Sequence, residues 1–597
     1  MAEILQQTDS IIDFDILING KKIKDTVKVQ EISIDMEVNR ITSATIIVQD
    51  GGAIGVVDQP FTNSEGADFI PGTEIEISLG NIDKTEKVFK GIIVSQRLKV
   101  KGDKSQLTVK CKDKAVSMSK GRYNAIFQNK KDSDAIKDII SKYGLDFEMD
   151  ATSQEHPVLM QYNCSDWDYL LNRAEANNML VNTYQNKLYI IKNDFNGPAK
   201  FEIKSSQIVI DIDLSLESEN IPTEYNMASW NPDTQEIVST SLRVNDSLGQ
   251  GNLSATELSE NLSKSSHIYS SNFIEKEEMK TWLESRADAA VLQKIQGKIT
   301  IPGSNRIIAG DIIILSEFST RFNGKAFISK VTHSLQNGVW VTELTVGKSA
   351  KSHASFPDVE DMGASGLIPA LKGTQIAIVK QIIEDPNNNY RVLVTLPAFT
   401  GTGQEEGIWA RMAFPYASAD AGFFFFPEID DEVLVHFINN DPRFPVITGS
   451  LYSTKNKPKE TPDDKNQFKA IHSKSGISIR FDDDEKVLVF ETPDGNSCTL
   501  NDKEKSITLK DLSGNSITLN DGGILIDSIK DVKLGAQGDV QISATGSIDL
   551  KANGDVKSDG TNIQFNAKSG FTAKGNASAE ISASGQTTVK GAMVMIN

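Results

Sequence analysis

The stretch GAQGDVQISATGSIDLKANGDVKS, residues 535–558, carries a repeat of eight residues. Its glycines recur at that spacing (Gly538, Gly546 and Gly554), and pairs of apolar residues follow them (Val540 and Ile542, Ile548 and Leu550, then Val556). The register slips by one residue near Ile563 and Phe565, and it resumes with Phe571, Ile581 and Val589. A fixed internal period indicates a stacked repeat.

Each octad predicts one short strand and one turn. Apolar residues two apart lie on the same face of a strand, and glycine supplies the turn. One such strip has a narrow apolar face and two unpaired edges, so it is not stable alone. We therefore expect several copies to wind around a common axis with the apolar pairs inward.

Composition also favours an intertwined needle. From Gly535 onward, five lysines balance five acidic residues, so identical copies can lie side by side without strong repulsion. The last proline is Pro493, so nothing later removes a ladder donor. The alternative is a disordered Gly/Ser/Asn-rich tail, but disorder does not require an apolar period.

The whole chain has 597 residues and a formal charge of −19. This length predicts several domains, and the acidic balance argues against nucleic acid or an anionic membrane as the main partner. The three cysteines (Cys111, Cys164 and Cys498) are far apart and show no disulfide or metal spacing. No cofactor is predicted.

The N-terminus has no Sec-type signal pattern, and the richest apolar run, Gly422–Pro427, is too short to span a bilayer. We expect synthesis in the cytoplasm, with export, if any, performed by a machine.

Residues 11 to about 118 alternate between apolar and polar side chains, as half-buried strands do. Asn19-Gly20 is a hairpin signal. The pattern predicts a β-barrel or sandwich, with strands at 14–18, 31–36, 74–79, 88–94 and 107–111.

Three helices are predicted farther along. The first is residues 133–143, closed by Gly144, and the second is 165–178, capped by Ser165 with Asp168 three residues on. The third is Glu275 to Gly297. With strands at 187–191, 312–315 and 326–346, the first 350 or so residues form one or more α+β domains.

Residues 351–373 form a polar linker, and short strands follow from Thr374 to Tyr452. A compact all-β domain of this size suggests a five-stranded barrel such as an OB-fold. A charged connector spans 453–466. Residues 474–528 then begin the needle in coarser units, because the motif at 495–500 is echoed nineteen residues later at 514–519.

The barrel region resembles that of VgrG spike proteins. The run that carries this resemblance comprises Trp409–Pro415, Gly422–Pro427, Asp431–Val435 and Asp441–Tyr452. Weaker hub-like patterns lie at Val88–Gly91, Asp166–Leu170 and Val331–His333. The order of parts is also similar to VgrG: a phage tail-hub-like region, an OB barrel and a triple-stranded β-helix.

The resemblance implies a mainly β, multidomain, homotrimeric spike of a contractile injection machine. The implied domains are a tail-hub-like region with α+β barrels (1–365), an OB-fold domain (366–455), and a connector with the intertwined β-helix needle (456–597). The implied partners are inner-tube (Hcp-like) and baseplate proteins, a PAAR-repeat tip protein and effector cargo, with only transient contact with a target membrane. Met593, Val594, Met595, Ile596 and Asn597 are the residues predicted to dock the tip protein; the alternative is that they are simply the last turn of the needle.

Two departures from the wider architecture bear on activity. Only the short connector 453–473 stands where a phage relative carries a lysozyme domain, and we expect no effector domain after Gly591. No histidine lies beyond His472, so the apical iron of some phage spikes is not predicted. We expect no enzyme activity and no bound metal.

Other chemical motifs have simpler explanations. Ser117–Lys120 matches S-x-x-K without a companion motif, so a surface turn is favoured. His436 lies in an apolar strand, Asp482–Glu485 lacks calcium-loop spacing, and Gly401–Gly403 is no nucleotide loop. These favour a structural histidine, a solvated hairpin turn and an ordinary loop.

Two rival functions remain. A trimeric adhesin or tail fibre would carry a receptor-binding head or an anchor, and neither is visible in the sequence. A β-helical polysaccharide depolymerase would use aromatic platforms and paired carboxylates, and the octad tract has no Trp or Tyr.

Overall fold

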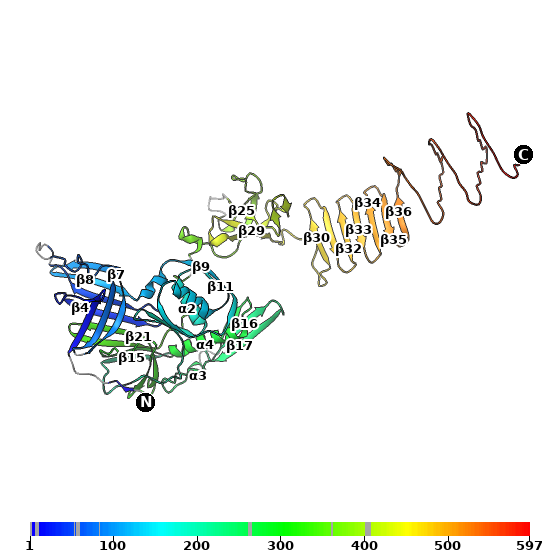
Figure 1. The fold of residues 1–597 in the computed structure, drawn as a ribbon. Helices are drawn as coiled ribbons and strands as arrows, with labels where there is room; N and C mark the ends of the chain where they lie inside the picture. The colour runs from blue at the N-terminus through cyan, green and yellow to red at the C-terminus, as the bar shows by residue number, and fades with distance from the viewer. Residues whose placement is uncertain are drawn as a thin grey trace. The chain divides into compact units, whose positions relative to one another are not determined.

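The computed structural model describes residues 3–5, 11–52, 54, 60–82, 84–260, 265–359, 362–399 and 407–596. The chain divides into two compact units, Met1–Leu451 and Tyr452–Asn597 (Figure 1). The fold is mainly β, as predicted, and helices are few among the described residues.

The largest sheet, in the first unit, has fourteen strands. Its main path runs β1-β14-β20-β21-β4-β5-β8-β7-β6-β2-β3, and β22, β19 and β15 continue from β21. The strands are β1 (Glu3–Ile4), β2 (Ile12–Ile18), β3 (Lys21–Lys22), β4 (Val29–Glu37), β5 (Ser43–Gln49), β6 (Glu74–Asn81), β7 (Lys84–Lys101), β8 (Lys104–Lys112), β14 (Phe201–Lys204), β15 (Asp211–Leu216), β19 (Ile295–Pro302), β20 (Ile312–Ser316), β21 (Gly324–Gln336) and β22 (Val339–Val346).

The five strands predicted near the N-terminus are confirmed as parts of β2, β4, β6, β7 and β8. The hairpin signal is confirmed as well. Asn19 and Gly20 have φ values of 48° and 76°, and they turn β2 into β3. Asparagine and glycine tolerate this left-handed backbone, which matches the twist of the flanking strands.

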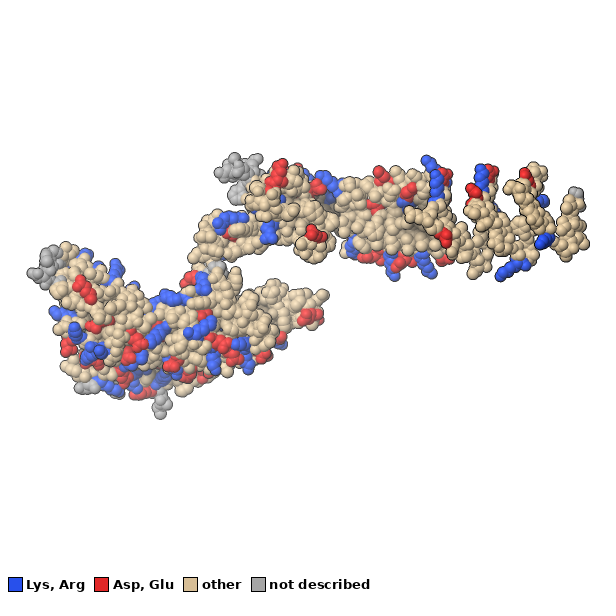
Figure 2. Space-filling model, turned by 45° about the horizontal axis from the view of Figure 1, so that its top comes forward, with Lys and Arg blue, Asp and Glu red and all other residues tan. Residues whose placement is uncertain are grey.

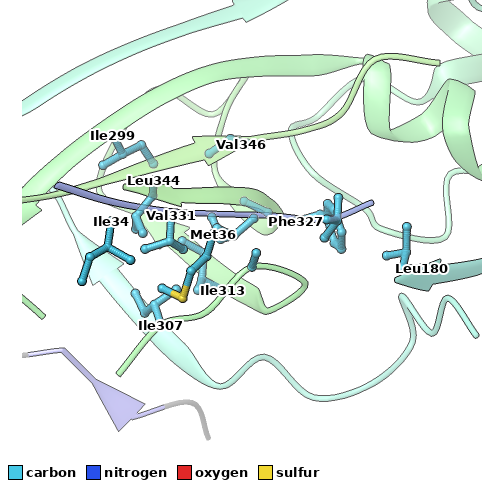
Figure 3. Close-up of a cluster of buried hydrophobic side chains, with 14 of the residues drawn as sticks. Ile34, Met36, Leu180, Ile299, Ile307, Ile313, Phe327, Val331, Leu344 and Val346 are labelled. Carbon is cyan, nitrogen blue, oxygen red and sulfur yellow. The ribbon is translucent and has the colours of Figure 1, made fainter. Parts of the chain in front are cut away.

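The core of this sheet gathers inward-facing side chains from distant parts of the chain. From Ile32 to Met36, every second residue of β4 is buried, as alternation dictates. Figure 3 shows part of this core, with Ile34, Met36, Leu180, Ile299, Ile307, Ile313, Phe327, Val331, Leu344 and Val346 labelled.

A second core lies under a smaller lobe, residues 113–192. It contains η1 (Lys114–Ser119), β9 (Tyr123–Lys131), α1 (Asp132–Ser141), β10 (Asp146–Met149), β11 (Glu155–Cys164), α2 (Asp166–Ala176), β12 (Met179–Tyr184) and β13 (Lys187–Lys192). Gly144 has φ 59°, and Ser165 Oγ accepts a hydrogen bond from Asp168 N at 3.0 Å. Both helix-end predictions are confirmed.

A three-stranded sheet and a long helix complete this part of the first unit. They are β16 (Glu224–Asn231), β17 (Glu236–Arg243), β18 (Ser265–Ser270), the short α3 (Ala255–Ser259) and α4 (Lys276–Gln293). The predicted end of α4 at Gly297 is wrong by four residues. From Ile295 onward the backbone pairs with β15 and β22 as β19, so sheet hydrogen bonds end the helix.

Lys294, the residue between α4 and β19, is a buried cation. Its Nζ pairs with the Asp246 carboxylate and donates to Gln250 O at 2.6 Å and Leu253 O at 3.0 Å. A buried ammonium is tolerated when all three of its protons find acceptors. Lys294 therefore holds the loop 246–253 against the end of α4.

The segment after β22 contains two short 3₁₀ turns, η2 (His353–Ser355) and η3 (Gly363–Gly366). The barrel that follows confirms the five-stranded prediction, because β23-β24-β25-β29-β28 close on themselves. Its strands are β23 (Gln375–Gln381), β24 (Val392–Thr395), β25 (Ile408–Met412), β28 (Glu432–Phe437) and β29 (Pro445–Ser450), with a small ribbon of β26 (Ala417–Ser418) and β27 (Ala421–Gly422) and short 3₁₀ turns η4 (Pro397–Phe399) and η5 (Ile438–Asn440).

Asp385 organises the loop between β23 and β24. Its carboxylate accepts hydrogen bonds from Asn389 N at 2.7 Å and from Arg391 Nε and Nη2 at 3.1 and 2.5 Å. The Arg391 guanidinium is the largest influence holding the Asp385 pKa well below its usual range, and backbone N–H groups assist. Because this loop holds Tyr390 at φ 55°, the extended backbone of β24 begins only at Val392.

The second unit begins with a seven-stranded antiparallel meander, in which each strand pairs with the next (Figure 1). The strands are β30 (Phe468–His472), β31 (Ser478–Asp482), β32 (Val487–Glu491), β33 (Ser497–Asn501), β34 (Ser506–Lys510), β35 (Ser516–Asn520) and β36 (Gly523–Asp527). We call residues 468–527 the blade. The echoed motifs of the sequence are confirmed as turns leading into β33 and β35.

Replacing Lys294 by methionine tests the buried ion pair. Lys294→Met leaves the Asp246 carboxylate buried without its cation, which costs about 3 to 5 kcal/mol. We expect a clearly lower melting temperature of the first unit. The matched control is Lys298→Met, whose exposed partner is Glu343 at 2.9 Å and which should cost under about 1 kcal/mol. Equal effects of the two substitutions would contradict the account.

The Asp385 loop predicts a pH dependence. The folded-state pKa of Asp385 is lowered, so its stabilisation is present above the ordinary value of 3.8 and is lost as pH falls toward the folded value. Asp385→Asn should lower the melting temperature of the barrel at neutral pH. The difference from wild type should narrow below about pH 4; a difference that widens in acid would show that the carboxylate is not the stabilising form.

Candidate functional site

The blade presents a continuous apolar face. Directly paired residues of an antiparallel sheet point to the same side, as do residues two apart on one strand. The strand register therefore aligns two apolar rows on one face. The first row is Ile471, Ile479, Phe490, Cys498, Leu509, Ile517 and Ile526; the second is Phe481, Leu488, Leu500, Ile507, Leu519 and Ile524.

The opposite face is mostly polar. Its central row is Ala470, Arg480, Val489, Thr499, Thr508, Thr518 and Leu525. Charged side chains gather at the two rims of the blade, where the chain turns (Figure 2). The blade is thus a sheet with one side suited to water and one side suited to a core.

A single chain does not bury the apolar face. Ten members of the two rows keep between 37 % and 71 % of their surface exposed. A hollow of about 860 Å³ lies on this face, and residues of the first row from Ile479 to Ile526 line it. An exposed apolar face of this extent marks an interaction site.

Asparagine side chains fix successive turns of the blade in the same way. Asn496 Oδ1 accepts from Leu512 N at 3.1 Å, and Asn515 Oδ1 accepts from Ile529 N at 3.1 Å. The Asn515 side chain is also the largest influence lowering the pKa of Asp511. These bonds explain why the sequence repeats Gly-Asn-Ser nineteen residues apart.

Beyond the blade, the chain bends at regular intervals (Figure 1). Bends fall at 529–530, 537–538, 545–546, 553–554, 560–561, 568–569, 576–577, 584–585 and 592. The spacing is eight residues except for one step of seven before 560–561, so the predicted period and its slip are both confirmed. No strand forms in 528–596 within one chain, because nothing there supplies a neighbouring ladder.

The apolar residues of the octads are exposed without exception among those described. They include Ile542 at 69 %, Leu550 at 76 % and Ile581 at 85 %. The rings of Phe565 and Phe571 stack on each other, with their centroids 6.1 Å apart, near the point where the repeat register slips. Like the blade, this tract has an apolar surface that its own chain does not cover.

The predicted tip residues lie together at the end of this tract. Met593, Val594, Met595 and Ile596 are all exposed, and no buried contact holds them in the single chain. Asn597 lies outside the described residues. Their role in docking stays a prediction.

The residues of the chemical motifs that have simpler explanations in the sequence lie as follows. Ser117 lies in η1, where its hydroxyl bonds Lys114 O at 2.8 Å, and His436 is an exposed residue of β28. Asp482–Glu485 enter the turn between β31 and β32, with Asp482 Oδ1 accepting from Asp484 N and Glu485 N. Gly401–Gly403 lie outside the described residues.

In the part of the chain that the structure describes, no cluster of three or more His, Cys, Asp or Glu side chains has the arrangement to hold a metal ion. None of the helices described is both long and apolar enough to cross a bilayer.

Sequence reasoning placed the apolar contact surface in the octads and overlooked the blade face. The signal was present as strict alternation, for example Ile479-Arg480-Phe481 and Ile507-Thr508-Leu509. What the alternation alone could not supply was the register that aligns every strand into the same two rows.

Three known families match the chain. Residues 8–337, more than half of it, match the Alg8 N-terminal domain. Residues 375–452 match the type VI secretion system/phage-baseplate injector OB domain, and residues 486–553 match the phage baseplate V C-terminal trimerisation domain. The chain belongs to the Alg8 N-terminal domain family. Parts of it are also similar to spike proteins of the VgrG family. The trimerisation match covers most of the blade and the first octads.

Curated relatives agree with the domain matches. The type VI secretion system spike protein VgrG1b of Pseudomonas aeruginosa is 22% identical over 404 residues, covering 60% of this chain and 51% of the relative. The actin cross-linking toxin VgrG1 of Vibrio cholerae is 30% identical over 98 residues, covering 16% of this chain and 9% of the toxin. The chain therefore aligns with about half or less of the length of these relatives.

The comparison with solved structures finds a component of the Escherichia coli type VI secretion system, the c3393 protein, at a TM-score of 0.39 and 12% identity, covering 73% of this chain and 99% of that chain. It also finds a chain from the Francisella PdpA-VgrG complex at a TM-score of 0.38 and 10% identity, covering 87% of this chain and 88% of that chain.

Proposed function

We propose that this chain is the homotrimeric central spike of a contractile injection apparatus. Residues 1–365 attach it to the inner tube and baseplate, the OB barrel connects hub and needle, and residues 456–597 form the piercing needle. The observation that carries this proposal is the apolar face of the blade, which is continuous over seven strands and uncovered in one chain.

Three copies solve the burial problem of the needle. Around a three-fold axis, each blade turns its two apolar rows inward and its polar face to water. The octads then pair with neighbours in other copies, and closure removes their unpaired edges. The match of residues 486–553 to a trimerisation domain supports this arrangement.

The function we propose is mechanical. Interchain ladders and an interior of Ile, Leu, Val and Phe make the needle stiff, and its chains separate only by breaking many contacts together. Contraction of a surrounding sheath supplies the work, and the spike leaves the cell or particle toward its target in that stroke. We assign it no catalytic residue and no cofactor; effectors travel with it as cargo.

A matched pair of substitutions tests the trimer. Leu509 lies on the apolar face and its neighbour Thr508 on the polar face. Leu509→Asp removes about 2 kcal/mol of burial per copy and brings three carboxylates toward one axis, so the detergent-resistant trimer band should be lost. Thr508→Asp should keep that band.

Both variants are compared on unheated detergent gels and by the barrel melting temperature, which should be unchanged. Retention of the trimer band in Leu509→Asp would contradict burial of this face between copies.

The tip residues give a second test. We propose that Met593–Asn597 dock a PAAR-repeat protein, since exposed methionine and isoleucine at a needle end suit an apolar seat. Met593→Ser with Met595→Ser should weaken capture of such a protein at least tenfold, about 1.4 kcal/mol or more, while the trimer persists. The control is Ala592→Ser. Unchanged capture by the double variant would assign these residues to the last needle turn alone.

A further inference from the structure

The segment after β22, residues 348–359, is held against helix α2 of the first unit. We call it the strap. Ser352 Oγ and His353 N both donate to Glu175 Oε2, at 3.1 and 2.8 Å, and His353 Nε2 lies 3.1 Å from Asp168 Oδ1. The two carboxylates belong to α2, so one side of the strap is fastened to that helix.

The other side of the strap borders a cleft of about 760 Å³. Its remaining walls come from the ends of β4, β15, β19, β21 and β22. The charged residues that line it are the cations Arg40, Lys298, Lys348 and Lys351 and the acids Glu37, Glu175 and Asp213.

Three of these cations crowd together without counter-ions. Arg40 and Lys351 both lie over the ring of Phe356, at 5.2 and 4.5 Å from its centre. Within the described ranges, the side chains of Arg40, Lys348 and Lys351 form no ion pair or hydrogen bond with the protein. The fourth cation, Lys298, is already paired with Glu343 at 2.9 Å.

Lys348 is the most enclosed of the three. Burial is the main cause that lowers its pKa, and the positive charges of Arg286 and Arg40 lower it further. Glu175 and Glu37 act in the opposite direction. Glu175, however, is paired at 3.7 Å with Arg286, which does not line the cleft. Among the described residues, the lining acids left without an ion pair are Glu37 and Asp213, two against the three unpaired cations, so the cleft keeps an excess of positive charge.

We propose that the cleft binds a small polyanion carrying phosphate or carboxylate groups, which joins Lys348 and Lys351 of the strap to Arg40, just after β4. A bound oxyanion relieves the repulsion among these cations and gives the half-buried ammonium a partner. The volume admits several such groups at once. The ligand fastens the free side of the strap, and so stiffens the connection that leads from hub to barrel.

Hydrogen exchange of the full-length assembled protein tests this. Pyrophosphate and citrate are titrated separately, each at an ionic strength held constant with sodium chloride. We expect saturable protection of amides in residues 348–359 with at least one probe; protection by pyrophosphate alone assigns a phosphate ligand, and protection by citrate alone assigns a carboxylate ligand.

Variants separate the cleft from general charge effects. Lys351→Gln and Lys348→Met should each weaken the titration at least tenfold, whereas Lys187→Gln, an exposed lysine paired with Glu148 elsewhere, should leave it unchanged. Lys351 is exposed, so its variant should fold normally. No saturable protection with either probe, or equal weakening in Lys187→Gln, overturns the proposal.

Discussion

The constraint that governs this molecule is an apolar surface that a single chain does not bury. In the blade, seven strands align two apolar rows on one face, and that face is open to water in one copy. In the octads, the backbone itself lacks hydrogen-bonding partners, because residues 528–596 form no strand within one chain. An apolar face open to water and backbone groups without hydrogen-bond partners both cost free energy. The second unit therefore requires other copies of itself to cover the face and to pair the backbone.

The first unit is built on the opposite principle. The hub sheet, the lobe under α2 and the barrel each enclose a hydrophobic core made from their own residues. Two fully buried charges are satisfied locally: Lys294 by three acceptors, and Asp132 by Arg173 and Asn177. The hub and barrel can therefore fold before the copies associate. This division suits the spike that we propose, whose base must be complete while its needle winds together.

Much of the fold follows from short-range patterns in the sequence. Period-two alternation identifies the hub strands, Asn19-Gly20 identifies a hairpin, and spacing alone identifies the octads with their one-residue slip. Each of these signals acts between residues close in the chain. The five-stranded barrel follows from the short strands and the size of the region Thr374–Tyr452, and the run from Trp409 to Tyr452 adds the family resemblance.

Features that depend on distant contacts were not predictable in this way. The strap reads as a polar linker in the sequence, yet His353 meets Asp168 across 185 positions of chain. The end of α4 is fixed by strands β15 and β22, and the blade face by a register that alternation does not specify. The tip residues lie at the other extreme: nothing in a single chain contacts them, so their assignment rests on exposure and position alone.

The central claim is that copies of the chain bury the apolar face of the blade between them. Its most direct test is the mass of the protein in solution, measured by light scattering over a wide dilution series. The account predicts a mass three times that of the 65.3 kDa chain, unchanged on dilution because the needle buries its apolar rows between copies. A stable, soluble species with the mass of one chain would contradict it, since the blade face would then be exposed to water without aggregation.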